Sequence, residues 1–125
     1  MNRRVFLIAA LALAGCASLP PPKIQAPPGS ALQELEPLYL ALAGRDALTI
    51  QVSSNGCTAK EDFAFYVEPR GEAVTLAFGR KRIDTCKSFA MGRQELTFSW
   101  AELGLKPRTP VFLLNPLVPW TGPGA

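Results

Sequence analysis

The sequence predicts a small α+β domain that is mainly antiparallel β: a single small sheet or sandwich of about five strands, with one or two short helices and one disulfide. Short stretches that alternate apolar and polar residues recur from residue 48 onward, which is typical of half-buried strands. Six of the twelve prolines and seven of the ten glycines lie in the same part of the chain, and such residues mark turns. Two cysteines, Cys57 and Cys86, lie among the predicted strands, where a disulfide would support so small a core.

Residues 1–15 predict a cleaved signal peptide. Two arginines, Arg3 and Arg4, precede an apolar run of nine residues (5–13), and small residues follow. A basic start, a short apolar run and a small-residue cleavage site form the layout of a secretory signal peptide. The run is too short for a membrane-spanning helix, which needs about 20 residues.

The end of this segment carries a motif at Leu13, Ala14, Gly15 and Cys16. It resembles the lipobox of bacterial lipoproteins, Leu-(Ala/Ser)-(Gly/Ala)-Cys, and the resemblance covers only about the first 17 residues. The resemblance implies lipidation of Cys16, cleavage between Gly15 and Cys16, and acylation of the new amine with chains such as palmitate. More than one chain gives stable anchoring. Cleavage as an ordinary secreted protein near Ala17 is the alternative.

Residues 16–30 predict a lipidated, proline-rich tether. Five prolines fall within residues 17–30. Proline restricts φ and donates no N–H, so this segment favours an extended spacer that buries nothing. Residues 31–125 then form the small disulfide-stapled domain.

The residue after Cys16 bears on location. Lipoproteins kept in the inner membrane usually carry aspartate there, and this chain has Ala17. The resemblance therefore implies an outer-membrane lipid anchor facing the periplasm, with the membrane as one partner.

Two of the 13 basic residues, Arg3 and Arg4, leave with the signal peptide, so 11 remain against 10 acidic residues. That balance gives no indication of nucleic-acid binding.

The first element expected in the domain is a helix. Leu32, Leu35, Leu38 and Leu42 follow one another at helical spacing. Because proline is best tolerated at the first position of a helix, we expect a short helix from Pro37 to the glycine at position 44.

Four stretches predict strands. Residues 48–53 alternate, as expected for a half-buried strand, whereas residues 62–68 are apolar on both faces, as expected for a central strand. A type I turn over residues 68–71 would join the latter to a strand at 73–79 as a hairpin. Residues 94–99 alternate again.

The last elements are a helical turn and a short strand. Ser99 and Glu102 have the spacing of a capping box, and Gly104 would end the single turn that they start. Residues 111–114 predict a short strand bounded by prolines.

Cys57 and Cys86 predict a disulfide, because paired cysteines in an exported chain usually join. Closing a loop of this length contributes roughly 3.5 kcal/mol in the chain-entropy model. A redox pair is the alternative, since Lys81, Arg82 and Lys87 near Cys86 would favour a thiolate.

No catalytic, metal or cofactor site is expected. The chain has no histidine, and a zinc site needs four ligands, usually Cys or His. No nucleophile elbow, P-loop or dinucleotide-binding motif occurs. We interpret Glu61, Asp62 and Asp84 as solvated loop carboxylates rather than a glycosidase pair.

Two features are candidate binding surfaces. Arg80, Lys81 and Arg82 form a basic run that could contact an anionic surface, or that is simply a solvated loop. Near the C-terminus, Trp120 either packs back onto the sheet, which we favour, or is exposed to a partner.

Two segments of the domain, residues 56–68 and 80–86, are similar to small uncharacterised proteobacterial lipoproteins, a likeness that implies no particular activity. We expect a non-catalytic binding or structural module of the cell envelope with an envelope protein as partner. One alternative is a periplasmic inhibitor or immunity protein against a cell-wall-degrading enzyme. The other is a small cell-wall-acting enzyme, which the short chain and the lack of histidine disfavour.

Overall fold

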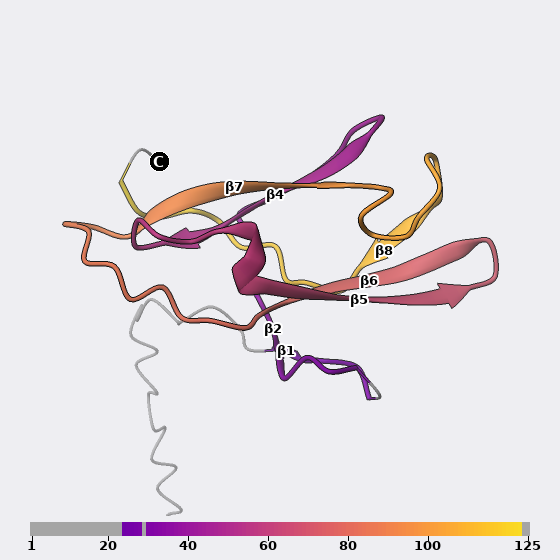
Figure 1. Cartoon of the computed structure of the whole chain (residues 1–125), viewed down its shortest axis with the longest axis horizontal. Helices are drawn as coiled ribbons and strands as arrows, with labels where there is room; N and C mark the ends of the chain where they lie inside the picture. Colours follow the sequence, from indigo (N-terminus) through magenta and orange to yellow (C-terminus); the bar gives the residue numbers. More distant parts are fainter. Residues whose placement is uncertain (1–23, 29, 124–125) are drawn as a thin grey trace, which may run out of the picture.

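Two three-stranded sheets pack face to face and hold the apolar core between them (Figure 1). The computed structural model describes residues 24–28 and 30–123. The sheets have the orders β3-β4-β7 and β5-β6-β8, and β1 and β2 form a separate pair. The elements are β1 (Ile24–Gln25), β2 (Glu34–Leu35), β3 (Leu40–Ala43), β4 (Ala47–Ser54), the 3₁₀ turn η1 (Lys60–Asp62), β5 (Phe63–Arg70), β6 (Ala73–Arg80), β7 (Gly92–Ser99) and β8 (Val111–Leu113). The predicted fold class is confirmed as a sandwich, with helix reduced to η1 in the described part of the chain.

The sheet β3-β4-β7 shows why alternation produces a half-buried strand. Every second residue of β4 is buried, and the residues between them are half-exposed. On the outer face, the Thr49 and Thr97 hydroxyls are 3.3 Å apart, and Gln51 donates to Glu95 at 3.0 Å. The outer face of this sheet is therefore tied by polar cross-strand pairs, while the inner face enters the core.

The central strand of the other sheet is β6, and not the strand predicted at residues 62–68. All six residues from 74 to 79 are buried, whereas β5 lies at an edge and leaves Phe65 41% exposed. Apolar residues on both faces of β5 suggested a central strand. Pairing by β6 on both sides, antiparallel with β5 and parallel with β8, decides the order.

The hairpin between β5 and β6 is confirmed, but its turn differs from the predicted one. β5 continues through Pro69, which pairs with Val74, and ends at Arg70. Gly71 and Glu72 form the two-residue loop, with Gly71 at φ 64°. A glycine with positive φ at the first loop position matches the right-handed twist of the flanking strands, and edge strand β5 tolerates a proline.

The helix predicted from residue 37 to residue 44 is wrong. This stretch contains β3, which pairs antiparallel with β4, and the backbone N–H of Tyr39 donates to the Gln51 carbonyl. Leu38 is fully buried, while Leu40 and Leu42 point outward. Spacing of leucines fits a helix or a strand equally well, and the pairing with β4 decides between them.

The capping box is confirmed as a single turn after β7. The Ser99 backbone N–H donates to the Glu102 carboxylate at 2.8 Å, and the Glu102 N–H donates to the Ser99 hydroxyl at 3.0 Å. The turn ends at Gly104, whose φ is 71°. It places Trp100 and Leu103 in the core.

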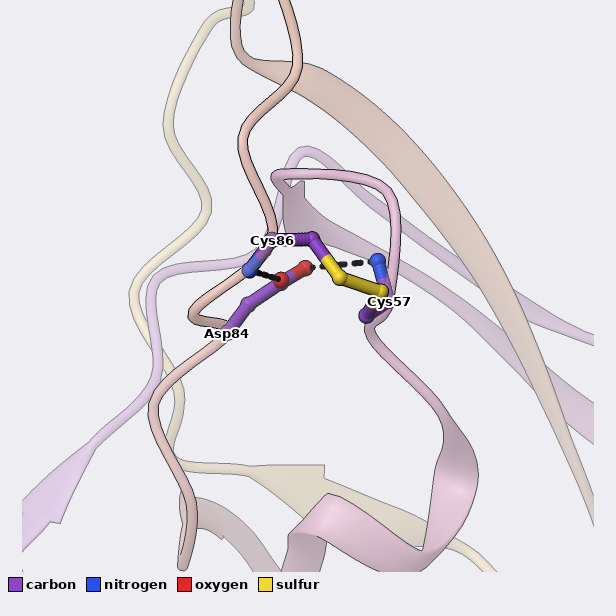
Figure 2. A group of neighbouring side chains, drawn as sticks. All are labelled: Cys57, Asp84 and Cys86. Carbon is purple, nitrogen blue, oxygen red and sulfur yellow. Dashed lines mark hydrogen bonds between the residues drawn. A yellow bond between two sulfur atoms is a disulfide. The ribbon is translucent and has the colours of Figure 1, made fainter.

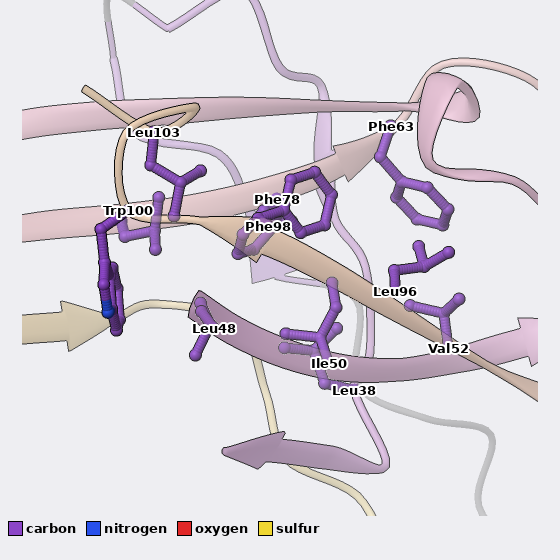
Figure 3. Close-up of a cluster of buried hydrophobic side chains, with 11 residues drawn as sticks. Leu38, Leu48, Ile50, Val52, Phe63, Phe78, Leu96, Phe98, Trp100 and Leu103 are labelled. Carbon is purple, nitrogen blue, oxygen red and sulfur yellow. The ribbon is translucent and has the colours of Figure 1, made fainter. Parts of the chain in front are cut away.

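The core lies between the two sheets (Figure 3). Phe78 of β6 and Phe98 of β7 meet at its centre with ring centroids 4.9 Å apart. These contacts across the sandwich tie the sheets together, because buried aromatic pairs add to the stability from area burial.

The end of the predicted tether belongs to the folded part of the chain. Ile24 pairs with Leu35 to form the β1–β2 ladder. Beside it, a Cβ on Gly79 would lie 2.9 Å from the Leu32 side chain and 3.0 Å from the Glu34 carbonyl oxygen, so this close packing of residues 32–34 on β6 requires glycine. No helix within residues 24–28 and 30–123 is long and apolar enough to cross a membrane.

Asn115 completes the edge of β6 beyond the point where β8 ends. It is 5% exposed. Its Oδ1 accepts from the Phe78 N–H, and its Nδ2 donates to the Phe78 and Glu36 carbonyls, each at 2.8 Å. The amide thus takes the place of a strand residue: it satisfies the Phe78 N–H and gives the Phe78 carbonyl a second donor beside the Glu36 N–H, which lies at 3.0 Å.

We expect Asn115→Ala to lower the free energy of unfolding by ~3 kcal/mol, because it removes three hydrogen bonds from the side chain to backbone groups, two of them fully buried. Urea unfolding measures the change as a lower midpoint. Gln94→Ala, at an exposed position on β7, is the control and should stay within ~0.5 kcal/mol of wild type. Equal effects of the two substitutions would contradict the role given to Asn115.

Candidate functional site

The long connection from β6 to β7 is pinned to the exit of β4 by the predicted disulfide, which is confirmed (Figure 2). Cys57 and Cys86 are joined with their Cα atoms 5.7 Å apart, and they lie 29 positions apart in the sequence. The connection therefore has a covalent attachment point close to its middle.

The Asp84 carboxylate forms a second attachment beside the disulfide. It collects hydrogen bonds from both chain segments that the disulfide joins, and Figure 2 shows two of them. The donors are the backbone N–H groups of Asn55 (2.7 Å), Cys57 (3.0 Å) and Cys86 (3.0 Å) and the hydroxyls of Thr58 (2.7 Å) and Ser54 (3.2 Å). One side chain thus holds the β4 exit loop and the β6–β7 connection in a single arrangement.

These donors keep Asp84 charged. The hydrogen bond from the Thr58 hydroxyl does most to hold the pKa of Asp84 well below its usual range, with the N–H groups of Cys86, Cys57 and Asn55 adding to it and partial burial opposing it. A carboxylate whose oxygens are already taken up by donors is suited to holding structure rather than to moving protons.

Cys57, Asp84 and Cys86 lie together as potential metal ligands, but both sulfur atoms are committed to the disulfide.

The interpretation of the loop carboxylates as solvated is wrong for two of the three. Glu61 is exposed, as expected. Asp62 is half-buried and accepts from the Ala59 N–H at 2.9 Å, and Asp84 is the attachment described above. A local signal for Asp84 exists in the sequence, because aspartate often accepts from the N–H two residues later, which here belongs to Cys86.

The basic run at residues 80–82 does not form one surface patch. Arg80 is half-buried and binds Glu36 at 2.8 Å and the Ser53 carbonyl at 2.8 Å. Arg82 is exposed and lies 3.4 Å from an Asp62 oxygen, and Lys81 is exposed beside it. Because one cation of the run is used inside the fold, only Lys81 and Arg82 remain for a contact with an anionic surface.

Cys16 lies outside the described residues.

The pinned connection carries apolar side chains into solvent. Ile83 is 84% exposed, Phe89 is completely exposed, and Met91 is 49% exposed. We call residues 83–91 the 83–91 loop. Beneath it lies a small cavity of about 150 Å³ lined by Ser53, Ser54, Asn55, Arg80, Ile83, Asp84 and Met91. The sequence analysis did not identify these residues as a surface feature. Apolar side chains are usually buried, so an apolar residue in a sequence is expected to belong to the core.

The C-terminal tryptophan packs back onto the domain, as favoured from the sequence. The Trp120 ring meets the Tyr39 ring edge-on with centroids 4.9 Å apart, and its Nε1 donates to the Pro123 carbonyl at 2.9 Å. The Arg93 guanidinium lies 5.1 Å from the centre of the indole. Trp120 therefore holds the tail rather than offering a contact surface.

Asp84→Asn should lower the Tm at pH 7 by several degrees and flatten the acid limb of the stability profile. A depressed pKa contributes stability that is complete above the ordinary value of 3.8 and is lost as the pH falls below it. Thermal unfolding between pH 7 and pH 2 tests this, with exposed Asp46→Asn as the control. A wild-type acid limb retained by Asp84→Asn would refute the assignment.

Comparison of the chain with protein-family models, with curated proteins and with solved structures gave no match. The arguments that follow therefore rest on the residues and their geometry.

Proposed function

We propose that this protein is a lipid-anchored lipoprotein of the outer membrane, facing the periplasm, and that its domain is a non-catalytic module that binds another envelope protein through the 83–91 loop. The observation that carries the proposal is the exposure of Ile83, Phe89 and Met91 on a loop that the disulfide and Asp84 hold in place. The lipobox resemblance at residues 13–16 supports the anchor.

Exposed apolar side chains contribute most to binding when the free protein already holds them in position. Ordering a loop on association costs free energy, and a loop that is already ordered avoids much of that cost. Here, attachment points at Asp84 and Cys86 lie between Ile83 and Phe89. Large apolar residues on such a loop are the kind of side chain that dominates protein interfaces.

A more specific version of the proposal is an inhibitor or immunity protein against a cell-wall-degrading enzyme. The complete exposure of Phe89 on a fixed loop favours it, because one projecting aromatic side chain can enter a concave site. In that case the partner is an enzyme, and the 83–91 loop occupies its cleft.

A photo-crosslinking residue tests the contact in the full-length chain in its native envelope. With the crosslinker in place of Phe89, we expect one discrete protein adduct. The matched control is the crosslinker in place of Glu72, an exposed residue of the β5–β6 hairpin, which should give none. Ile83→Asp should reduce the adduct at least tenfold, as the loss of one central apolar anchor does.

Absence of an adduct from position 89, or the same adduct from both positions, would contradict docking through the 83–91 loop. If the adduct forms, its partner can be assayed for cell-wall hydrolysis with and without the purified protein. Loss of hydrolysis supports the inhibitor version, and unchanged hydrolysis supports a structural role.

Mass spectrometry of the purified N-terminal peptide tests the anchor separately. We expect an acylated Cys16 at the N-terminus, and Cys16→Ser should leave an uncleaved precursor. Density-gradient fractionation should place the protein with outer-membrane markers. An unmodified peptide that begins at residue 17 or later would exclude lipidation at Cys16.

A further inference from the structure

The turn before β8 contains an arginine where the backbone suits glycine. The Thr109 N–H donates to the Lys106 carbonyl at 3.3 Å, Pro107 occupies the second position, and Arg108 occupies the third with φ 68°. A positive φ at the third position is the mark of a type II turn, and glycine or asparagine normally stands there. Among residues 24–28 and 30–123, Arg108 is the only non-glycine residue with positive φ. The backbone of a non-glycine residue is strained at positive φ, and residues strained in this way are concentrated at functional sites.

Arg108 lines a cavity of about 350 Å³ near the start of β4, at the end of this strand away from the disulfide. Ala43, Trp100, Pro107 and Val111 contribute apolar surface, and Arg45 is the second arginine of the lining. The cavity has the size of a small-molecule site, with apolar walls and a few charged groups.

The turn that carries Arg45 is held by the tryptophan of the cavity wall. Trp100 donates from its backbone N–H to the Asp46 carbonyl and from Nε1 to the Gly44 carbonyl, both at 3.1 Å. The turn is also closed by a bond from the Gly44 N–H to the Ala47 carbonyl at 2.8 Å. Arg45 and Arg108 are therefore carried by two hydrogen-bonded turns rather than by flexible loops.

Among residues 24–28 and 30–123, no carboxylate pairs with the guanidinium of Arg45 or of Arg108. In the described part of the chain, no acidic oxygen lies within 4.0 Å of Arg45 or Arg108, and the neighbouring Asp46 does not line the cavity. Two unpaired cations that share a cavity repel each other, and an anion between them relieves that repulsion. Guanidinium groups bind carboxylates and phosphates through paired N–H donors.

We propose that this cavity binds a small organic anion, with a carboxylate or phosphate group between Arg45 and Arg108 and an apolar body against Trp100. This site lies apart from the 83–91 loop, so the proposal is independent of the proposed function. It also explains why an arginine stands at a strained backbone position. The turn alone would favour glycine, whereas binding of the anion needs the guanidinium group.

NMR titration of the full-length chain with benzoate, phenyl phosphate and benzamide tests the site. Trp100 and Trp120 each give an indole N–H signal, and only Trp100 lines the cavity. We expect benzoate or phenyl phosphate to shift the Trp100 signal saturably and to leave the Trp120 signal in place. Benzamide, which has nearly the same shape without the charge, should bind at least tenfold more weakly. The better of the two anions identifies the head group.

Substitutions assign the contacts. Arg45→Gln and Arg108→Gly should each weaken binding of the anion at least tenfold, whereas Arg82→Gln, at an exposed arginine near the disulfide, should not change it. No saturable shift of the Trp100 signal with either anion, equal binding of benzamide, or an equal loss in Arg82→Gln would overturn the proposal.

Arg108→Gly provides a readout independent of binding. Glycine removes the strain at φ 68°, so the Tm should rise by a few degrees while the affinity for the anion falls. A lower Tm with unchanged affinity would show that Arg108 serves the fold and would overturn its role in the site.

Discussion

The side-chain amide of Asn115 is the interaction on which the rest of the structure depends. β6 is buried on both faces and carries backbone donors and acceptors on both edges. β5 satisfies one edge over the whole strand, but β8 covers only three residues of the other. Asn115 then binds both backbone groups of Phe78 and also the carbonyl of Glu36. It joins the C-terminal segment, the central strand and the N-terminal segment at a single buried point.

From that point, polar contacts continue toward the disulfide. The Glu36 carboxylate binds the Arg80 guanidinium, Arg80 donates to the Thr58 hydroxyl at 3.3 Å, and Thr58 donates to Asp84. The side chains of Glu36 and Arg80 are 13% and 16% exposed, so burial of this pair costs desolvation energy that further hydrogen bonds must offset. Arg80 has such bonds, to the Ser53 carbonyl and to Thr58. The small core and this hydrogen-bonded polar network thus both support the 83–91 loop.

The two candidate binding regions lie at opposite ends of β4. The 83–91 loop is attached near Ser54, at the end of the strand, and the cavity between Arg45 and Arg108 lies beside the turn that precedes Ala47. In both places a polar attachment fixes the chain: Asp84 at one end and the indole of Trp100 at the other. A sandwich of two three-stranded sheets can therefore hold two different surfaces, one apolar and projecting, the other cationic and concave.

The sequence by itself determined the features that depend on neighbours in the chain. The alternation of β4, the hairpin of β5 and β6, and the capping box of Ser99 and Glu102 follow from local patterns, and the disulfide follows from having two cysteines within the predicted domain. The signal peptide and lipidation at Cys16 stay predictions, because they lie outside the described residues.

Tertiary structure decided everything that needs a partner distant in sequence. The leucines of residues 32–42 fit a helix or a strand, and β3 forms because β4 offers an open edge. From the sequence alone, Arg80 is expected to be a surface cation, and only the folded chain shows that Glu36 lies beside it. The same holds for Asn115, and for Arg45 and Arg108, which lie 63 positions apart yet share one cavity. Local patterns constrain the backbone through neighbours three or four residues away, whereas strand order, burial of polar groups and convergence of charges depend on contacts that form only when the whole sandwich closes.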